Sequence, residues 1–194
     1  MTVITRFAPS PTGRLHIGHA YSALFACKKA KKADGKFILR IEDIDPTRCR
    51  PEFEKGIYED LSWLGLSWER PVRRQSEHMN DYSAAIEKLK QKELLYPCFC
   101  TRKEIQEEIA RAGAAPHGPE GHLYPGTCRS LSKAEQEDKI AAGLPYALRL
   151  DVAKATRSCA PLHWTDLERG DQTATPEILG DVVLARKDTP ASYQ

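Results

Sequence analysis

Short apolar runs and helical repeats alternate along the first part of the chain. The runs at residues 3–7 and 36–41 have the length of strands, and the first leads directly into a Pro-Ser-Pro-Thr-Gly turn. Between them, apolar residues of the segment 17–27 recur three or four positions apart, which predicts a helix that Gly35 ends. The predicted apolar face of this helix consists of Ile17, Ala20, Leu24 and Cys27. Strand, helix and strand within about 40 residues predict a βαβ unit with parallel strands.

The same reasoning predicts further elements downstream. Helical spacing at residues 53–64 and 79–89 predicts two amphipathic helices. From Pro97 the character changes, because cysteines cluster and residues 112–126 are rich in Ala, Gly, Pro and His, which indicates a loop-rich insertion. Beyond the insertion the pattern predicts one helix and two strands. They span residues 133–142, 146–152 and 179–185.

Composition and charge narrow the class of protein. The chain has 194 residues, with 29 basic and 27 acidic side chains and a net charge of +2. No apolar run approaches the ~20 residues of a membrane span, and the N-terminus lacks the apolar stretch of a signal peptide. We therefore expect no membrane association, a cytoplasmic location and reduced cysteines. The near-neutral charge excludes a generic polycation, so nucleic acid would bind through local patches. One lysine cluster is either a solvated helix end or a contact for RNA phosphate: Lys28, Lys29, Lys31 and Lys32.

The first motif with clear chemistry is a pair of histidines at the start of the first predicted helix. His16 and His19 lie three positions apart, so they share a face where the helix dipole and free backbone N–H groups favour anions. Gly18 between them lets a ligand lie close to the backbone. Two surface histidines without a ligand are the alternative. The turn before them and the βαβ unit around them favour a site for the phosphates of a nucleotide.

These residues resemble a known family. The sequence of His16–His19 is the His-Ile-Gly-His signature of class I aminoacyl-tRNA synthetases, and residues 6–13 resemble the opening of the glutamyl branch. Residues 39–48 are similar to that branch's second strand and loop. Within them, Ile44-Asp45-Pro46 resembles the glutamyl-queuosine tRNA(Asp) synthetases, whereas ordinary glutamyl-tRNA synthetases more often have Thr-Asp-Arg. The resemblance covers residues 6–194.

The resemblance implies an α/β fold: a Rossmann-like, parallel-sheet class I catalytic domain, incomplete here, with a zinc-bearing insertion. The first half of the catalytic domain is expected at residues 1–96, the insertion, similar to an acceptor-binding domain, at 97–187, and the return to the catalytic domain at 188–194. The remaining strands and a Lys-Met-Ser-Lys-Ser-type loop are expected beyond Gln194.

The same resemblance implies an activity. A monomer is expected to activate L-glutamate with ATP and Mg²⁺, and to transfer the glutamyl group to the queuosine base at the wobble position of tRNA(Asp). A fragment of a conventional glutamyl-tRNA synthetase that charges tRNA(Glu) is one alternative. An inactive zinc-binding or RNA-binding module is the other.

The resemblance also implies the roles of individual residues. His16 and His19 are the expected catalytic residues, which stabilise charge on the triphosphate as prepositioned donors. The expected ATP-binding residues are Pro9, Thr12, Gly13, His16, Gly18 and His19. The expected L-glutamate-binding residues are Arg6, Ala8, Ser10, Glu42 and Tyr193.

The charges of the glutamate-binding set suit a ligand with two carboxylates and one ammonium group. Arg6 supplies a guanidinium for the side-chain carboxylate, Glu42 an anion for the ammonium and Ser10 a hydroxyl for the other carboxylate. Arg6 and Glu42 also come near the C-terminal ends of two predicted parallel strands, where α/β sheets bind ligands. A salt bridge between Arg6 and Glu42, with no ligand, is the alternative.

The insertion carries a candidate metal site. Cys98 and Cys100 form a compact chelating pair, and Cys128 can close on the same ion, but zinc prefers four ligands in a tetrahedron. The resemblance implies that the phenolic oxygen of Tyr124 is the fourth ligand of one structural Zn²⁺, and two nearby histidines compete for that place. They are His117 and His122. Three buried thiols without a metal are the remaining alternative.

Overall fold

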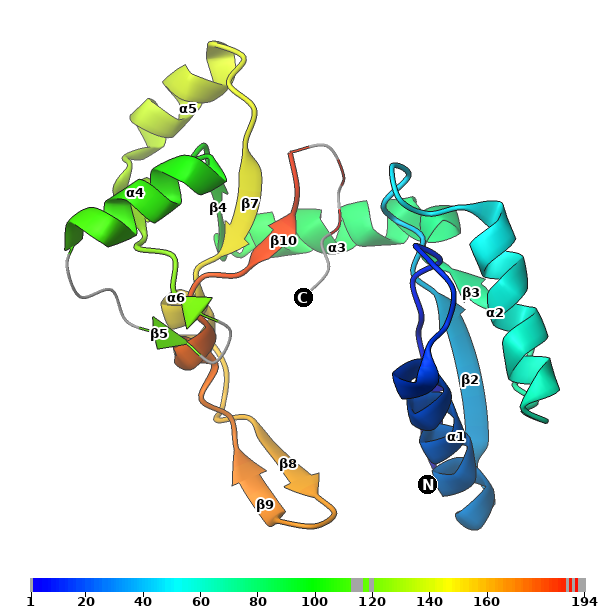
Figure 1. Ribbon diagram of the computed structural model, residues 1–194. Coiled ribbons are helices and arrows are strands. Elements are labelled where there is room, and N and C mark those ends of the chain that lie inside the picture. Colours follow the sequence, from blue (N-terminus) through cyan, green and yellow to red (C-terminus); the bar gives the residue numbers. More distant parts are fainter. Residues whose placement is uncertain (1, 113–116, 119–120, 188, 190, 192–194) are drawn as a thin grey trace. The chain divides into compact units, whose positions relative to one another are not determined.

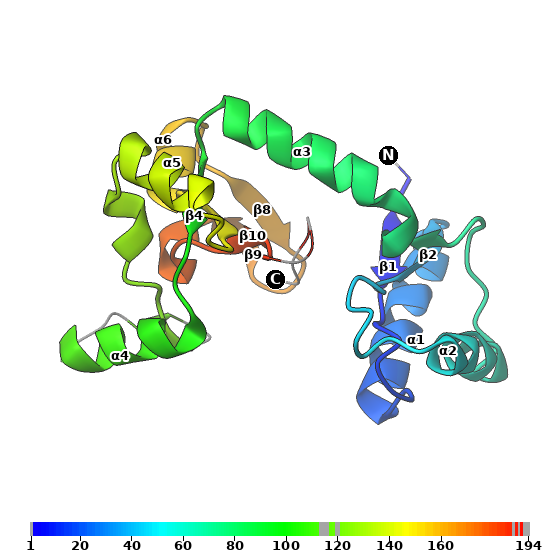
Figure 2. The same ribbon diagram turned by 90° about the horizontal axis from the view of Figure 1, so that it is seen from above.

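The structure is a computed structural model (Figures 1 and 2). It describes residues 2–112, 117–118, 121–187, 189 and 191. The chain divides into two compact units, Met1–Met79 and Asn80–Gln194. No helix in the described part of the chain is long and apolar enough to cross a membrane.

The first unit is built on the βαβ unit that the sequence predicts. Strands β1 (Ile4–Phe7) and β2 (Lys36–Ile41) are parallel, and helix α1 (Ile17–Lys32) connects them and packs on both. A short third strand extends the sheet in the order β1-β2-β3, again with parallel pairing. The other elements of this unit are α2 (Pro51–Trp63), β3 (Arg73–Arg74) and the 3₁₀ helix η1 (Gln75–His78). The expected parallel α/β architecture is therefore confirmed.

Small side chains let α1 pack closely on this sheet. The residues that α1 buries are Ala23, Cys27 and Ala30. The predicted apolar face is thus correct at Cys27 and wrong at Ile17 and Leu24, which are 86% and 41% exposed. The small residues of α1 recur at helical spacing as regularly as its larger apolar residues do. They occupy the inner face because their size lets the helix axis approach the strands.

The connection from α1 to β2 passes close to the backbone of Val3. The residue with the left-handed conformation is Asp34, at φ 47°, and the next residue, Gly35, donates its N–H to the carbonyl of Ala30 at 2.8 Å. A Cβ atom on Gly35 would lie 2.2 Å from the carbonyl oxygen of Val3. Gly35 therefore serves to let the chain pass β1, where Lys36 donates to that same Val3 carbonyl.

The second unit contains a three-stranded antiparallel sheet in the order β10-β7-β4. A hairpin, β8–β9, projects from the rest of this unit in Figure 1. The strands are β4 (Leu95–Cys98), β5 (His117–Gly118), β6 (Gly121–His122), β7 (Ala147–Leu150), β8 (His163–Asp166), β9 (Gly170–Thr173) and β10 (Val183–Ala185). The helices are α3 (Met79–Gln91), α4 (Arg102–Ala112), η2 (Thr127–Ser130), α5 (Lys133–Ala141), α6 (Val152–Arg157) and η3 (Pro176–Leu179).

The second unit departs from the sequence-based prediction at two places. The stretch expected as a loop-rich insertion begins within β4 and includes the regular helix α4. The strand expected at residues 179–185 is confined to β10, because Leu179 ends the 3₁₀ helix η3 and Gly180 has a φ of 62°. The compact units divide at Met79, and the domain bounds expected from the sequence stay a prediction.

Candidate functional site

The loops that follow β1 and β2 are joined at one edge of the sheet. The N–H of Glu42 donates to the carbonyl of Pro9 at 3.0 Å, and the N–H of Arg50 donates to the carbonyl of Pro11 at 2.9 Å. Pro9 and Pro11 are buried, and Ser10 between them is half-buried. The Pro-Ser-Pro turn is therefore held against the loop that carries Glu42, at the edge where parallel α/β sheets bind ligands.

Asp45 organises the second of these loops. Its carboxylate accepts hydrogen bonds from the backbone N–H and hydroxyl of Thr47, at 3.1 and 2.6 Å, and from Nε of Arg48 at 3.0 Å. Those bonds, the Thr47 hydroxyl first, lower the pKa of Asp45 to about 2. Asp45 thus has a local structural role in the Ile-Asp-Pro segment.

The two histidines of the signature cap the N-terminus of α1 reciprocally. His16 is the N-cap residue, and its Nδ1 accepts the N–H of Gly18 at 3.1 Å. The N–H of His16 donates to Nδ1 of His19 at 3.2 Å, which places His19 where a capping box usually has Glu or Gln. The ring centroids lie 3.8 Å apart. A Cβ atom on Gly18 would lie 3.0 Å from the His16 ring, so this glycine leaves room for the cap.

This cap determines which ring nitrogen each histidine presents. A neutral imidazole that accepts at Nδ1 carries its proton on Nε2. Burial, and then the neighbouring His16, lower the pKa of His19, which keeps its ring neutral. The ring of Phe7, at the end of β1, packs edge-on to that of His19 at 6.5 Å. The arrangement leaves an Nε2–H donor on each ring, next to the positive end of the α1 dipole.

Arg6 and Glu42 lie on the same face of the sheet. Thr5 and Phe7 face α1, since the Thr5 hydroxyl bonds the carbonyl of Ala26 and Phe7 contacts His19. Strand alternation therefore directs Arg6 to the opposite face. Arg6 pairs with Ile38 in the register, and Ile38, Arg40 and Glu42 share that face.

The ion pair at Glu42 involves a residue that sequence reasoning missed. Nη2 of Arg40 contacts Oε1 of Glu42 in a short ion pair, and both side chains are largely buried. The alternative of a salt bridge between Arg6 and Glu42 stays a prediction, and the ion pair found at Glu42 is the one with Arg40. Along the strand, Glu42 lies roughly 13 Å beyond the level of Arg6, from a rise of about 3.3 Å per residue. The signal that could have revealed Arg40 is its position two residues before Glu42, on the same strand face.

The other expected substrate-binding residues are distributed around the same turn. Ala8 and Gly13 are half-buried, and Thr12 is exposed with its N–H bonded to the carbonyl of Ser10 at 2.9 Å. Tyr193 lies outside the described residues. The turn after β1 thus carries Ala8 to Gly13, with Glu42 hydrogen-bonded to it at Pro9, and the binding roles expected for these residues stay a prediction.

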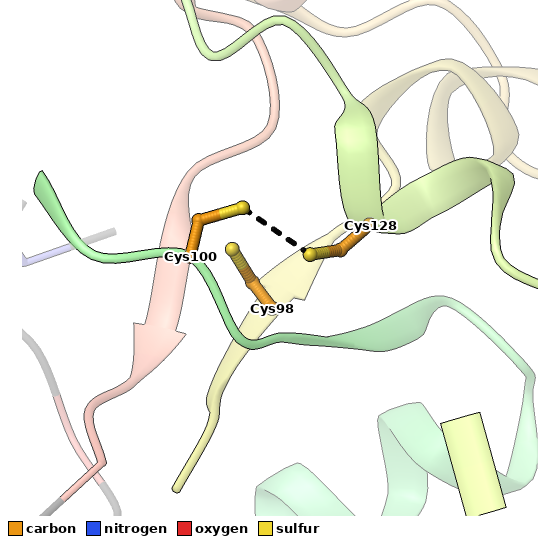
Figure 3. Close-up of side chains that lie close together, drawn as sticks. All are labelled: Cys98, Cys100 and Cys128. Carbon is orange, nitrogen blue, oxygen red and sulfur yellow. Dashed lines mark hydrogen bonds between the residues drawn. The ribbon is translucent and has the colours of Figure 1, made fainter. Parts of the chain in front are cut away.

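The second candidate site is a group of three thiols in the second unit. Figure 3 shows Cys98 and Cys100, from the end of β4 and the segment after it, pointing toward Cys128 in η2. Their sulfur atoms all lie within 4.8 Å of one another. The sulfurs of Cys100 and Cys128 are 3.4 Å apart. All six cysteines of the chain are free thiols.

The hydroxyl of Tyr124 lies beside two of these thiols. Its oxygen lies 3.5 Å from the sulfur of Cys98 and 3.7 Å from that of Cys100. A tetrahedral zinc ion with Zn–S bonds of about 2.3 Å and a Zn–O bond of about 2.0 Å separates sulfur from oxygen by about 3.5 Å and sulfur from sulfur by about 3.8 Å. The two sulfur–oxygen distances agree with that geometry, while the Cys100 and Cys128 sulfurs, at 3.4 Å, would move slightly apart to take up one ion. The side chains of the alternatives, His117 and His122, lie outside the described part of the structure.

Two groups of the cluster hold their protons tightly when no cation lies among them. Burial raises the pKa of Cys100 to about 12, and burial with the Cys98 hydrogen bond raises that of Tyr124. Burial acts the same way on Cys128, but hydrogen bonds from Tyr124 and the Phe99 N–H outweigh it and lower the pKa of Cys128. Four such groups cannot all become anions together unless a positive ion lies among them.

Comparison with known proteins agrees with this architecture. The family model for the catalytic domain of class I tRNA synthetases (E and Q) matches residues 2–194. The chain therefore belongs to the class I tRNA synthetase family of the glutamyl and glutaminyl type.

Its relatives fall into two named groups. The chain is 42% identical to a glutamyl-Q tRNA(Asp) synthetase of Rhodobacter capsulatus, over 98% of this chain and 69% of that protein. It is 39% identical to glutamate–tRNA ligase 2 of Nitrosococcus oceani, over 97% of this chain and 40% of that protein. A solved glutamate–tRNA synthetase of Elizabethkingia anophelis is similar over 100% of this chain and 41% of its own, with 30% identity and a TM-score of 0.76. The chain thus spans between two fifths and about two thirds of these relatives.

Proposed function

We propose that the protein takes part in ATP-dependent activation of L-glutamate. In this reaction an oxygen of the α-carboxylate attacks the α-phosphorus of ATP, the bond to the β-phosphate oxygen breaks, and pyrophosphate leaves. The products are glutamyl-adenylate and pyrophosphate. Mg²⁺ would accompany ATP and offset part of the triphosphate charge. The observation that carries the proposal is the reciprocal cap of His16 and His19, because it presents two Nε2–H donors at a helix N-terminus.

The histidines act in this proposal as donors and not as nucleophiles. Negative charge moves toward the leaving pyrophosphate as the reaction proceeds, and donors already fixed in direction stabilise it without reorganisation. The other residues of the turn have binding roles. Gly18 lets the phosphates approach the backbone, and Pro9, Thr12 and Gly13 line the turn beneath the nucleotide.

Glutamate recognition follows from the charges on the other face of the sheet. Arg6 would bind the side-chain carboxylate, Ser10 the α-carboxylate and Glu42 the ammonium group, with Ala8 beside them and Tyr193 as a further contact. A carboxylate accepts several donors, so Glu42 can bind an ammonium group while Arg40 stays paired with it. Arg40 then supports the orientation of Glu42.

The acceptor we propose is the cyclopentenediol of the queuosine base in tRNA(Asp). A diol oxygen attacks the carbonyl carbon of glutamyl-adenylate, AMP leaves, and the hydroxyl proton is released. The support is the Ile44-Asp45-Pro46 segment and the identity to glutamyl-Q tRNA(Asp) synthetases. Conventional charging of tRNA(Glu) is the second candidate, because glutamate–tRNA ligases are 39% identical. We place either reaction in the cytoplasm and assign it to a monomer.

We further propose that the cysteine cluster holds one structural Zn²⁺. Its ligands would be Cys98, Cys100, Cys128 and Tyr124, which leaves no open position for a substrate. The ion would join β4 to η2 and hold the insertion that we assign to residues 97–187. Residues 1–96 and 188–194 would then belong to the catalytic domain.

Exchange of pyrophosphate into ATP tests the activation step. Exchange that requires glutamate supports the proposal. Exchange that does not need tRNA favours the queuosine acceptor, and strict dependence on tRNA(Glu) favours the conventional ligase. If the protein binds zinc but does not exchange pyrophosphate with glutamate, the inactive module is the correct interpretation.

A further inference from the structure

Asp181 is a buried carboxylate that the glutamate and ATP chemistry leaves unexplained. Its side chain is only 4% exposed, and it lies in the segment before β10, far along the chain from the cysteines. We propose that Asp181 and Arg149 are positioning residues of the metal centre. This inference rests on the proposed metal site and assigns it a set of supporting contacts.

The carboxylate of Asp181 joins the two segments that carry the cysteines. Its Oδ2 accepts the hydroxyl of Tyr96 at 2.6 Å, and Tyr96 lies on β4 two residues before Cys98. The same oxygen accepts Nη1 of Arg129 at 2.9 Å, and Arg129 directly follows Cys128 in η2. One buried anion therefore fixes the distance between the strand and the turn that must converge on the ion.

The backbone of Asp181 orients a cation over the fourth ligand. Its carbonyl oxygen accepts Nη1 of Arg149 at 2.6 Å. The guanidinium carbon of Arg149 lies 3.9 Å from the ring centroid of Tyr124. A guanidinium at this distance is attracted to the face of the ring, so Arg149 fixes the ring plane and the direction of the Tyr124 hydroxyl.

The start of α6 holds Asp181 in this position. The N–H of Val152 donates to Oδ1 at 3.0 Å, while Oδ2 takes the two donors from the cysteine segments. Both carboxylate oxygens are thus engaged, and Arg149 and Val183 are paired in the β7–β10 register. Residues that orient metal ligands in this way typically contribute 10- to 100-fold to metal affinity.

The first test measures zinc affinity of the full chain by competition with a chromophoric chelator, together with the visible absorption of its Co²⁺ form. Arg149→Gln should weaken zinc binding roughly 10- to 100-fold and shift the Co²⁺ bands, because the oxygen ligand loses its orientation. Arg149→Lys keeps the charge over the ring and should restore part of the affinity. Arg157→Gln, at an exposed arginine of the same unit, is the matched control.

A double-mutant cycle separates positioning from a general structural role. If Arg149 acts through Tyr124, then Arg149→Gln should have no further effect on zinc affinity once Tyr124→Phe has removed the oxygen ligand. Asp181→Asn should weaken zinc binding in the same direction, with the exposed Asp138→Asn as its control. The cycle does not depend on whether Asp181→Asn folds.

The outcomes distinguish the inference from the metal site itself. If wild type binds one zinc ion and Arg149→Gln keeps the wild-type zinc affinity and Co²⁺ spectrum, the inference is overturned. The proposal of the metal site itself is then unaffected. Equal effects of Arg149→Gln with and without the Tyr124 hydroxyl also overturn the inference. Wild type that binds no metal overturns both.

Discussion

His16 and His19 hold each other in place at the start of α1. The N–H of His16 donates to Nδ1 of His19, and the two rings lie 3.8 Å apart. Each ring thereby accepts a backbone N–H at Nδ1, which leaves its Nε2–H available for a ligand. Helix capping and the proposed phosphate contact thus use different atoms of the same side chain, so substitution can separate them.

The first prediction concerns His16. Asparagine is a good N-cap residue, so His16→Asn should keep the stability of the chain, whereas His16→Ala should cost about 1 kcal/mol of unfolding free energy. Both variants lack the Nε2–H donor, and both should slow pyrophosphate exchange roughly 100-fold. Urea denaturation and exchange rates measure the two effects. An Asn variant with the wild-type exchange rate would remove His16 from the phosphate site.

The second prediction concerns the pH dependence of stability. Burial and His16 lower the pKa of His19 below its ordinary value of 6.5. The unfolded chain therefore takes up this proton near pH 6.5, while the folded chain takes it up only at lower pH. The contribution of His19 is fully present above pH 6.5, and stability falls as the pH drops below that value.

The matched variant for this prediction is His19→Gln. Glutamine is the usual residue at the third position of a capping box, so it keeps the bond to the His16 N–H without titrating. Urea denaturation between pH 5 and 8 should show a smaller loss of stability on acidification in His19→Gln than in wild type. Identical pH profiles would mean that the folded pKa of His19 is not lowered.

The fold of the first unit could be predicted because its signals are local. The strand predicted at residues 36–41 coincides with β2, and the helix beginning at Ile17 coincides with the start of α1. The buried face of α1 could not be predicted, because the sequence pattern does not show whether Ala23 and Ala30 or Ile17 lie against the sheet. The distance between helix and sheet determines this, and it depends on the fold.

The second unit and the supporting contacts depend on residues far apart in the chain. Strand β4 was not predicted because its identity comes from pairing with β7. Asp181 was not predicted because its partners Tyr96 and Arg129 lie 85 and 52 residues away. Tyr124 could be named only through the family resemblance, since its distances to the thiols come from the fold.

The third prediction concerns the close approach at Gly35. Gly35→Ala places a Cβ atom against the Val3 carbonyl, a backbone atom that cannot rotate away. The chain must shift, and we expect a loss of about 1–3 kcal/mol in unfolding free energy. Gly13→Ala is the control for stability, because a Cβ atom there has no neighbour within 4 Å. Equal stability of the two variants, measured by urea denaturation, would contradict the role assigned to Gly35.

The fourth prediction concerns the anion for the ammonium group. Glu42→Gln keeps the shape of the side chain but removes its charge, and we expect the KM for glutamate in pyrophosphate exchange to rise roughly 10- to 100-fold. Glu59→Gln, at an exposed residue of α2, should leave it unchanged. Unchanged glutamate affinity in Glu42→Gln would restrict Glu42 to its ion pair with Arg40.

The last prediction concerns the metal ion. Cys98→Ser removes a thiolate ligand, so the purified chain should lose its zinc, and the sheet β10-β7-β4 should become less stable because the ion joins β4 to η2. Cys159→Ser, at an exposed cysteine outside the cluster, is the matched control.

The first unit contains none of the proposed ligands, so its amide hydrogens should keep their protection in the Cys98 variant. Elemental analysis and hydrogen exchange measure the two effects. Because a zinc ion must displace protons from the thiols, chelators should also remove it more readily as the pH falls. Full zinc content in Cys98→Ser, or equal loss of protection in both units, would exclude a structural ion at this place.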